Sequence, residues 1–399
     1  MTKIAVLTAT RAEYGLLQPI IKKLIDCGEF DVRVVATGAH LSPEFGLTYK
    51  EILDSGVEID RRIEILVSSD SPVGISKSMG LAIISFAEYF EETKPDALMV
   101  LGDRYETLAV CCAAMNAKIP VIHLYGGETT EGAVDEAIRH SITKMSWLHF
   151  TSTPAYAKRV IQLGEDPSRV FCVGAMGVEN ALNKELLSRE ELERSIDFGL
   201  DGKYAVITFH PVTLENRSAG QQFKELLDAI SEKNDLKYII TKANADADGR
   251  IINQMTDEFV GNNKNVAAFE SLGAVRYLSA LRHAALVIGN SSSGIIEAPS
   301  FHIPTVNIGD RQRGRLCADS VINCAPVKSD ITAAMDRALS AEFAEIAAKA
   351  DNPYGDGDTS GKIVSVLRDI LRGENITLKK TFYDIDFDID GGNKREEGK

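Results

Sequence analysis

The sequence predicts an α/β protein built from two Rossmann-like, doubly wound domains with a cleft between them. Three observations predict this fold class. The chain has 399 residues, which exceeds one ordinary domain. Short apolar runs alternate with helical patterns, as in βαβ units with parallel strands. The alternation occurs twice, before and after a charged stretch at 183–203. Because doubly wound sheets bind ligands at the carboxyl ends of their strands, a functional cleft is expected between the two domains.

The first half alternates five buried strands with four helices. The apolar runs typical of buried parallel strands are Ile4–Leu7, Val32–Ala36, Ala97–Leu101, Val121–Leu124 and Val170–Val173. The helical patterns between them are Leu16–Leu24, Tyr105–Asn116, Ala133–Lys144 and Pro154–Leu163.

A second series of strands follows the charged stretch: Ala205–Phe209, Tyr238–Thr241, Val266–Phe269, Leu286–Gly289 and Thr305–Ile308. We therefore expect an N-terminal domain over 1–182 and a nucleotide-binding C-terminal domain over 183–360. A helix at Gly361–Arg372 is expected to cross back onto the first domain within a segment 361–385, and residues 386–399 form a charged, Gly-rich tail that we expect to be mobile.

Composition excludes several functions. With 58 acidic against 44 basic residues the net charge is −14, which argues against non-specific binding to nucleic acid or an anionic membrane. The six cysteines form no CxxC pair, as expected for reduced thiols in the cytoplasm. The N-terminal run Ile4–Leu7 is too short for a signal peptide, and no other segment reads as transmembrane. No HExxH, CxxC pair or EF-hand loop indicates a metal site.

The first strand of the chain leads into polar residues rather than a glycine-rich loop. Thr8–Gly15 replaces GxGxxG and no P-loop occurs, so a nicotinamide cofactor is not expected. Arg11 lies where a guanidinium would face an anion in the cleft; a surface pair with Glu13 is the alternative. Asp103 and Arg104 follow another strand, and Asp103 is either a catalytic carboxylate or a helix N-cap.

Charged side chains are densest between His123 and His140. Gly126-Gly127 permits a sharp turn before Glu128. On the following helix, Asp135 stacks over Arg139 and Glu136 over His140, because four residues separate the members of each pair. Ordinary helix salt bridges are one interpretation, but this crowding beside a strand exit favours a functional site.

Two motifs in the second half suit a phosphate. His210 ends a strand and would carry a proton or contact phosphate, with a structural histidine as the alternative. Ser291, Ser292, Ser293 and Gly294 precede a short helix, where backbone N–H groups and hydroxyls bind anions; simple Ser capping is the alternative. Glu297 lies one turn further and would accept hydrogen bonds from a ribose diol. The loop 309–315 offers three arginines, including Arg311, to a diphosphate.

Taken together, these motifs resemble the hydrolysing nucleotide-sugar 2-epimerases, which make N-acetylmannosamine from UDP-N-acetylglucosamine for sialic acid synthesis or the corresponding diacetamido sugar for legionaminic acid. The resemblance spans nearly the whole chain. It rests on the segments 10–15, 102–104, 126–128, 135–140, 210–211, 289–294 and 309–312.

The resemblance implies a glycosyltransferase-B-like fold, no cofactor, a nucleotide-sugar substrate and a homo-oligomer, either a dimer or a tetramer. It also implies elimination of the nucleotide to a glycal, followed by rehydration. Proton transfers would fall to Asp103, Glu128, Asp135, Glu136 and His210. The substrate and its diphosphate would be held by Arg11, Arg104, Arg139, His140, Arg311 and the serine turn, and the ribose by Glu297.

Tyr125 departs from the family pattern, because many members carry a glutamate there that is often cast as a catalytic acid or base. Either Glu128 covers that role or the family assignment needs revision. A glycosyltransferase of the same fold is the main alternative function, although the carboxylates around Gly126-Gly127 favour the epimerase. A non-catalytic nucleotide-sugar-binding protein is a third hypothesis, suggested only by Tyr125.

Overall fold

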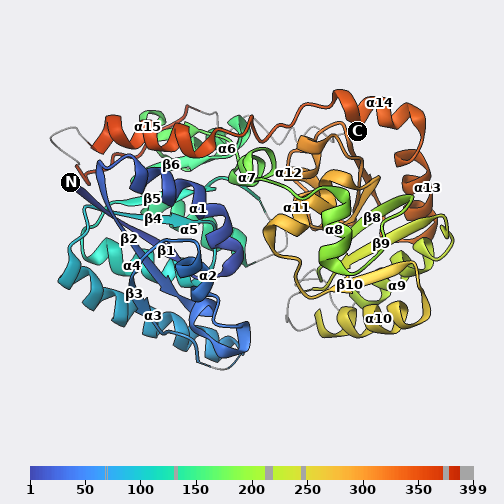
Figure 1. The fold of residues 1–399 in the computed structure, drawn as a ribbon. Coiled ribbons are helices and arrows are strands. Elements are labelled where there is room, and N and C mark those ends of the chain that lie inside the picture. The colour runs from blue at the N-terminus through green and yellow to red at the C-terminus, as the bar shows by residue number, and fades with distance from the viewer. Residues whose placement is uncertain are drawn as a thin grey trace.

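The computed structural model describes residues 1–67, 69, 71–129, 134–211, 219–243, 249–371 and 377–386 (Figure 1). It contains two all-parallel sheets flanked by helices, which confirms the predicted fold class. We call the part built on the seven-stranded sheet the first lobe and the part built on the six-stranded sheet the second lobe. None of the described helices is both long and apolar enough to cross a membrane.

The first lobe has the strand order β3-β2-β1-β4-β5-β6-β7. Its strands are β1 (Thr2–Thr8), β2 (Phe30–Thr37), β3 (Ile59–Ile63), β4 (Ala97–Leu101), β5 (Val121–Leu124), β6 (Leu148–Thr151) and β7 (Val170–Cys172). Its helices are α1 (Arg11–Asp26), η1 (Gly38–Leu41), η2 (Pro43–Phe45), α2 (Tyr49–Asp54), α3 (Pro72–Thr93), α4 (Tyr105–Asn116), α5 (Asp135–Met145), α6 (Pro154–Gln162), η3 (Pro167–Arg169) and α7 (Met176–Asn183). Helices α3 and α4 cover one face of the sheet and α1 the other, so apolar strands such as β4 are buried on both sides.

The second lobe repeats this plan with the strand order β10-β9-β8-β11-β12-β13. Its strands are β8 (Lys203–Thr208), β9 (Leu236–Thr241), β10 (Val266–Phe269), β11 (Leu286–Gly289), β12 (Thr305–Ile308) and β13 (Val321–Cys324). Its helices are α8 (Arg189–Ile196), α9 (Ala219–Ile230), α10 (Gly249–Asn262), α11 (Gly273–His283), α12 (Ser293–Ile296), η4 (Ala298–Phe301), α13 (Lys328–Ala338) and α14 (Ala341–Lys349).

The chain returns to the first lobe at its C-terminal end. Helix α15 (Thr359–Leu371) lies along α1, with Ile363 and Leu367 in the core of the first lobe (Figure 1). Residues 377–386 continue on the same lobe, where Trp147 Nε1 donates to the carbonyl of Thr377 at 3.0 Å. The domain boundaries expected from the sequence stay a prediction. The tail expected to be mobile lies, apart from Asp386, outside the described residues.

Each sheet reverses its strand order at one place, between β1 and β4 in the first lobe and between β8 and β11 in the second. At such a switch point the loops after two neighbouring strands run to opposite faces of the sheet and leave a crevice. Arg11 and Asp103 follow β1 and β4, and His210 and Ser291 follow β8 and β11. The topology therefore explains why these four predicted site residues gather in two groups.

Candidate active site

Asp103 follows β4 and faces the helix that begins after the glycine turn. The N-cap position of α4 is occupied by Arg104, so the capping interpretation of Asp103 is wrong. Its carboxylate instead forms an ion pair with the Arg139 guanidinium from α5. The burial of Arg139, whose side chain is 4% exposed, makes this contact more than a surface salt bridge.

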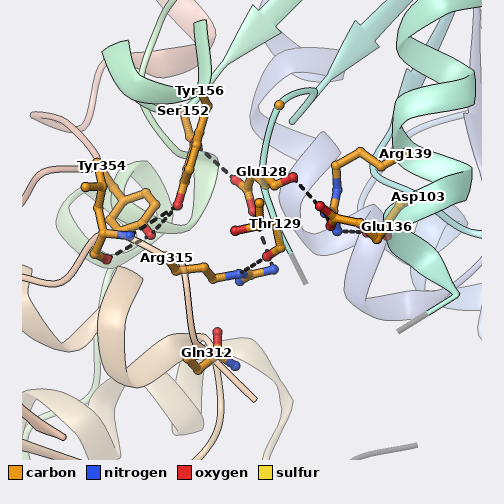
Figure 2. A network of polar contacts seen from close by, with 12 residues as sticks. Asp103, Glu128, Thr129, Glu136, Arg139, Ser152, Tyr156, Gln312, Arg315 and Tyr354 are labelled. Carbon is orange, nitrogen blue, oxygen red and sulfur yellow. Dashed lines mark hydrogen bonds and ion pairs between the residues drawn. The ribbon is translucent and has the colours of Figure 1, made fainter. Parts of the chain in front are cut away.

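Arg139 joins three acidic or carbonyl groups of the first lobe (Figure 2). Besides Asp103, it donates to Glu136 Oε2 at 3.1 Å and to the carbonyl of Glu128 at 2.9 Å. Glu136 Oε1 in turn lies 3.2 Å from His140 Nε2, which is the predicted stacking at four-residue spacing. Asp135 is exposed in the first turn of the same helix.

Glu128 is placed by the turn at Gly126-Gly127 after β5. Gly127 has φ of 79°, and a Cβ there would lie 2.3 Å from the carbonyl oxygen of Tyr156, so only glycine fits. Glu128 is 5% exposed. Its Oε1 accepts a hydrogen bond from Ser152 Oγ at 2.8 Å, and its Oε2 lies 3.6 Å from Arg315 Nη2 of the second lobe. The carboxylate is thus held from both lobes.

Tyr125 lies beside the Glu128 carboxylate, and its phenol cannot act as a base in place of a carboxylate. Its backbone is left-handed, with φ of 68°, and its Oη accepts a hydrogen bond from the backbone N–H of Met176 at 2.7 Å. Burial, with the negative charges of Glu128 and Glu297, raises the pKa of Tyr125 above its ordinary value. The phenol therefore stays protonated at neutral pH and offers no base.

The two arginines after β1 and β4 differ in their contacts. Arg11 donates to Ser271 Oγ of the second lobe at 2.6 Å and lies 3.7 Å from Glu51. The alternative pairing with Glu13 is wrong, because Glu13 accepts the backbone N–H of Ala9 at 2.7 Å. Arg104 forms a two-pronged pair with the buried Glu106, at 3.1 and 2.9 Å.

In the second lobe, Asn290 ties the histidine after β8 to the turn after β11. Its Oδ1 accepts from the backbone N–H of His210 and its Nδ2 donates to the His210 carbonyl, each at 2.7 Å. Arg311 Nη1 donates to the Asn290 carbonyl at 3.0 Å. Burial and the neighbouring Arg311 lower the pKa of His210 to about 4, so its imidazole is neutral at pH 7.

The serine turn does more than cap a helix. Ser292 is the N-cap residue of α12, yet within the described part of the chain its hydroxyl makes no capping bond. Ser291 Oγ accepts from the backbone N–H of Ser293 at 3.4 Å, Ser293 Oγ bonds the phenol of Tyr277, and Thr305 Oγ1 donates to the Gly294 carbonyl at 2.9 Å. Packing thus fixes the turn while hydroxyl and N–H groups remain at its edge.

A cavity of about 490 Å³ lies between the lobes. Arg11 and Tyr14 line it from the first lobe, and Ser271, Tyr277 and Glu297 from the second. Its volume is that of a small-molecule site. Burial raises the pKa of Glu297 to about 7, and its buried Oε2 has no hydrogen-bond partner among the described residues. Glu297 therefore lines the cavity and carries an oxygen that none of the described residues bonds.

The sequence did not identify the side chains that link these groups. Ser152, Asn290 and Arg315 each contact a predicted site residue. The signal for Arg315 was present, since it lies in the arginine-rich loop predicted to meet a diphosphate, but its contact with Glu128 required the fold. Among the described residues, no three His, Cys, Asp or Glu side chains are grouped to hold a metal ion.

The fold and the site define a class: two-lobed parallel α/β proteins with carboxylates at one switch point and a serine turn at the other. Comparison with known proteins narrows this class. The family model described as UDP-N-acetylglucosamine 2-epimerase matches residues 22–368, so the chain belongs to this 2-epimerase family.

Two curated relatives cover most of the chain. The "GDP/UDP-N,N'-diacetylbacillosamine 2-epimerase (hydrolyzing)" of Campylobacter jejuni is 42% identical over 342 residues, 86% of this chain and 88% of that protein. The "Polysialic acid biosynthesis protein P7" of Escherichia coli is 40% identical over 390 residues, 96% of this chain and 98% of that protein.

A solved structure supports the same fold. The UDP-GlcNAc 2-epimerase from Neisseria meningitidis bound to UDP-GlcNAc superposes with a TM-score of 0.79 at 20% identity, covering 92% of this chain and all of that one (100%). The family resemblance and the glycosyltransferase-B-like fold expected from the sequence are thereby confirmed.

Proposed function

We propose that the protein is a hydrolysing 2-epimerase. It converts UDP-N-acetylglucosamine, or a UDP- or GDP-linked diacetamido analogue, into the free 2-epimer and the nucleoside diphosphate, for sialic or legionaminic acid synthesis in the cytoplasm. The family description supports UDP-N-acetylglucosamine, the name of the Campylobacter relative supports a diacetamido sugar on UDP or GDP, and the name of the Escherichia coli relative supports a role in sialic acid synthesis.

One observation carries the proposal: carboxylates gather around a buried arginine after the strands of the first lobe, and a serine turn, a histidine and an arginine gather after the strands of the second. Asp103, Glu128 and Glu136 gather around Arg139 on the first lobe. The serine turn, His210 and Arg311 gather around Asn290 on the second. A nucleotide sugar that spans the lobes would place its sugar near the first group and its diphosphate near the second.

The first chemical step is an elimination. A carboxylate takes the proton from sugar C2, the C2–H electron pair forms the C1=C2 bond, and the C1–O bond breaks with its electrons leaving on the diphosphate. Glu128 suits the role of base, since its carboxyl group is held by Ser152 and faces Arg315. The second step adds water across the double bond, with oxygen to C1 and a proton to C2 from the opposite face. Asp103, Asp135 or Glu136 would supply that proton.

The leaving diphosphate needs charge stabilisation. Arg311 supplies a positive charge and the serine turn supplies hydroxyl and N–H donors. His210 is neutral before the ligand binds, and a diphosphate beside it would raise its pKa, so that it gains a proton as the anion arrives. Arg104, Arg11 and His140 would contact the substrate from the first lobe, and Glu297 would accept from the ribose hydroxyls.

Proton NMR in heavy water tests the proposal. The purified protein is incubated with UDP-N-acetylglucosamine and, in parallel, with the diacetamido sugar on UDP and on GDP. Release of a free 2-epimer carrying deuterium at C2 is expected, and the substrate that reacts fastest is the preferred one. Free nucleotide with an unepimerised, unexchanged sugar would overturn the epimerase and favour the glycosyltransferase. Binding without any product would favour a non-catalytic nucleotide-sugar-binding protein.

A further inference from the structure

Arg315 crosses from the second lobe to the first. It lies after β12 in the loop that also carries Arg311, yet its Nε donates to the carbonyl of Thr129 at 3.0 Å (Figure 2). Its Nη2 lies 3.6 Å from Glu128 Oε2. The guanidinium therefore contacts the first lobe at the carboxylate proposed as the base, rather than lying only along a diphosphate path as the arginine-rich loop suggested.

The surroundings hold Arg315 in this position. The next residue, Leu316, donates its backbone N–H to Tyr156 Oη of the first lobe at 3.3 Å, and its carbonyl accepts from Tyr354 Oη at 3.0 Å. The two phenol oxygens are 3.1 Å apart. These bonds fix the backbone next to Arg315, and the bond from its Nε to the Thr129 carbonyl holds the side chain beside Glu128.

The ion pair between Arg315 and Glu128 is shielded from solvent, so breaking it should have a large effect. The side chains of Arg315 and Glu128 are 12% and 7% exposed. Removing one partner of such a pair leaves an uncompensated buried charge, unlike the loss of an exposed salt bridge. Arg315 also acts on Glu297, because its charge opposes the rise in the pKa of that buried carboxyl whereas Glu128 adds to it. One cation therefore serves a carboxylate of each lobe.

We propose that Arg315 is a positioning residue of the 2-epimerase: it reaches across the lobes to orient Glu128 and to keep it as a carboxylate ready to take the C2 proton. This proposal rests on the proposed function. Ser152 fixes one oxygen of Glu128 from the first lobe, and Arg315 faces the other from the second. The base is thus complete only when both lobes contribute.

Other charged and titratable groups surround Glu128 and stay in place when Arg315 is changed. Arg139 and Arg159 bond the carbonyls of Glu128 and Gly127, respectively. The groups that interact with the Glu128 charge from neighbouring elements are Tyr125, Tyr156, Glu297 and Tyr354. Both of these arginines donate to backbone carbonyls, whereas Arg315 faces Oε2 of the Glu128 carboxylate.

The test compares Arg315→Met, which removes the charge at similar length, with Arg315→Lys, which keeps the charge. Arg282→Met, at the exposed end of α11 in the second lobe, is the matched control. We expect Arg315→Met to lower kcat by about 100-fold with KM little changed, the scale of one positioned proton-transfer group. The acidic limb of its pH profile should move to higher pH, because a buried carboxylate without its cation is easier to protonate.

Arg315→Lys should recover part of kcat and return the acidic limb toward the wild type, and Arg282→Met should match the wild type. A raised KM with an unchanged kcat and pH profile in Arg315→Met would mean that Arg315 binds the diphosphate, and the proposal would be overturned. An equal loss in Arg282→Met would overturn it as well. If Arg315→Met does not fold, Arg315→Gln, which also removes the charge, takes its place, and a wild-type pH profile in Arg315→Gln counts against the proposal.

Infrared spectra over a pH series separate this inference from the proposed function. The carboxyl band of Glu128 is assigned by its loss in Glu128→Gln. In Arg315→Met the protonated band should grow in at a higher pH than in the wild-type protein. If the wild-type protein turns over none of the nucleotide sugars, the proposed function fails, but the infrared comparison still decides whether Arg315 controls the ionisation of Glu128.

Discussion

At the scale of single residues, Glu128 combines burial with a hydrogen bond at one carboxylate oxygen and an ion pair at the other. Ser152 and Arg315 hold its two oxygens and Arg139 holds its backbone carbonyl. Glu128→Gln keeps the shape and the bond to Ser152 but removes the negative charge. We expect it to lose most turnover, by about 100-fold or more, because a proton-transfer group contributes on this scale.

Steady-state rates and calorimetric titration with UDP check this prediction. The dissociation constant for UDP should stay near that of the wild-type protein, because Glu128 lies in the sugar-facing group rather than beside the serine turn. Glu58→Gln, an exposed acid of the first lobe, serves as the control. A wild-type turnover rate in Glu128→Gln would remove Glu128 from the mechanism.

Gly177 leaves room for the carboxylate of Glu297 in the cavity. A Cβ there would lie 2.2 Å from Glu297 Oε1, so Gly177→Ala must push the carboxylate away. We expect nucleotide affinity to fall by roughly tenfold, since a hydrogen bond to a charged group contributes about 1.5–3 kcal/mol. The stability should not fall in parallel, because alanine favours the helix.

Gly220→Ala in α9 is the matched control for that change, since it also replaces a helical glycine and, among the described residues, its Cβ would meet Ile251 Cγ2 alone, at 3.3 Å. Calorimetric titration with UDP and with GDP is the measurement. Unchanged affinity for both in Gly177→Ala would show that Glu297 does not contact the nucleotide.

The positions of the site residues followed from the sequence where each one ends an apolar run. Asp103, Glu128 and His210 come shortly after β4, β5 and β8, and strand ends of parallel sheets meet at one edge. The residues that contact these side chains could not be predicted from the sequence. Arg315 and Thr129 are 186 residues apart in sequence, so their contact depends on how the two lobes pack, which no local pattern records.

At the scale of elements, most of the strands were predicted from their apolar runs, whereas β3 and the fully buried β6 were not. Tyr105–Asn116 matches α4, whereas β3 was missed because Ile-Asp-Arg-Arg-Ile at a sheet edge carries charges instead of an apolar run. Strand β6 was missed because His149 interrupts it, and this histidine is buried against Glu165 at 3.0 Å. The charge of these segments is satisfied by tertiary contacts, which the pattern alone does not show.

Helix α15 makes a separate prediction, because it carries the C-terminal part of the chain into the core of the first lobe. Leu367 is fully buried there and packs with the residues of α1. Leu367→Ala should lower the free energy of unfolding by about 2–5 kcal/mol through lost burial and a residual cavity.

Urea unfolding followed by circular dichroism measures this loss, with the exposed Ser365→Ala on the same helix as the control. At low temperature, where the variant stays folded, its dissociation constant for UDP should equal that of the wild type. A midpoint equal to that of the control would mean that α15 is not a structural part of the first lobe.

At the scale of the whole molecule, the two switch points carry different kinds of chemical group. The first lobe supplies carboxylates, the second supplies a serine turn and a neutral histidine, and the loop after β12 touches both. This division explains why neither half of the sequence alone resembles a complete site. It also explains why the interlobe residues, such as Arg315, are the ones that local patterns failed to assign.

The same burial that builds the first lobe predicts how the stability of the protein depends on pH. His123 is fully buried, with Nε2 2.8 Å from the Gly102 carbonyl and Nδ1 3.3 Å from Thr143 Oγ1, and burial lowers its pKa from 6.5 to about 3. Above pH 6.5 the histidine is neutral in both the folded and the unfolded chain and adds no pH dependence. Below pH 6.5 the unfolded chain binds one more proton at this histidine, so the free energy of unfolding decreases as the pH falls toward 3, by about 1.4 kcal/mol per pH unit.

His123→Gln removes this titrating group, and with it the extra proton that the unfolded chain binds. Urea unfolding at a series of pH values should therefore give wild-type and variant curves that run parallel above pH 6.5 and converge below it, whereas curves parallel down to pH 4 would show that His123 is not held neutral in the fold.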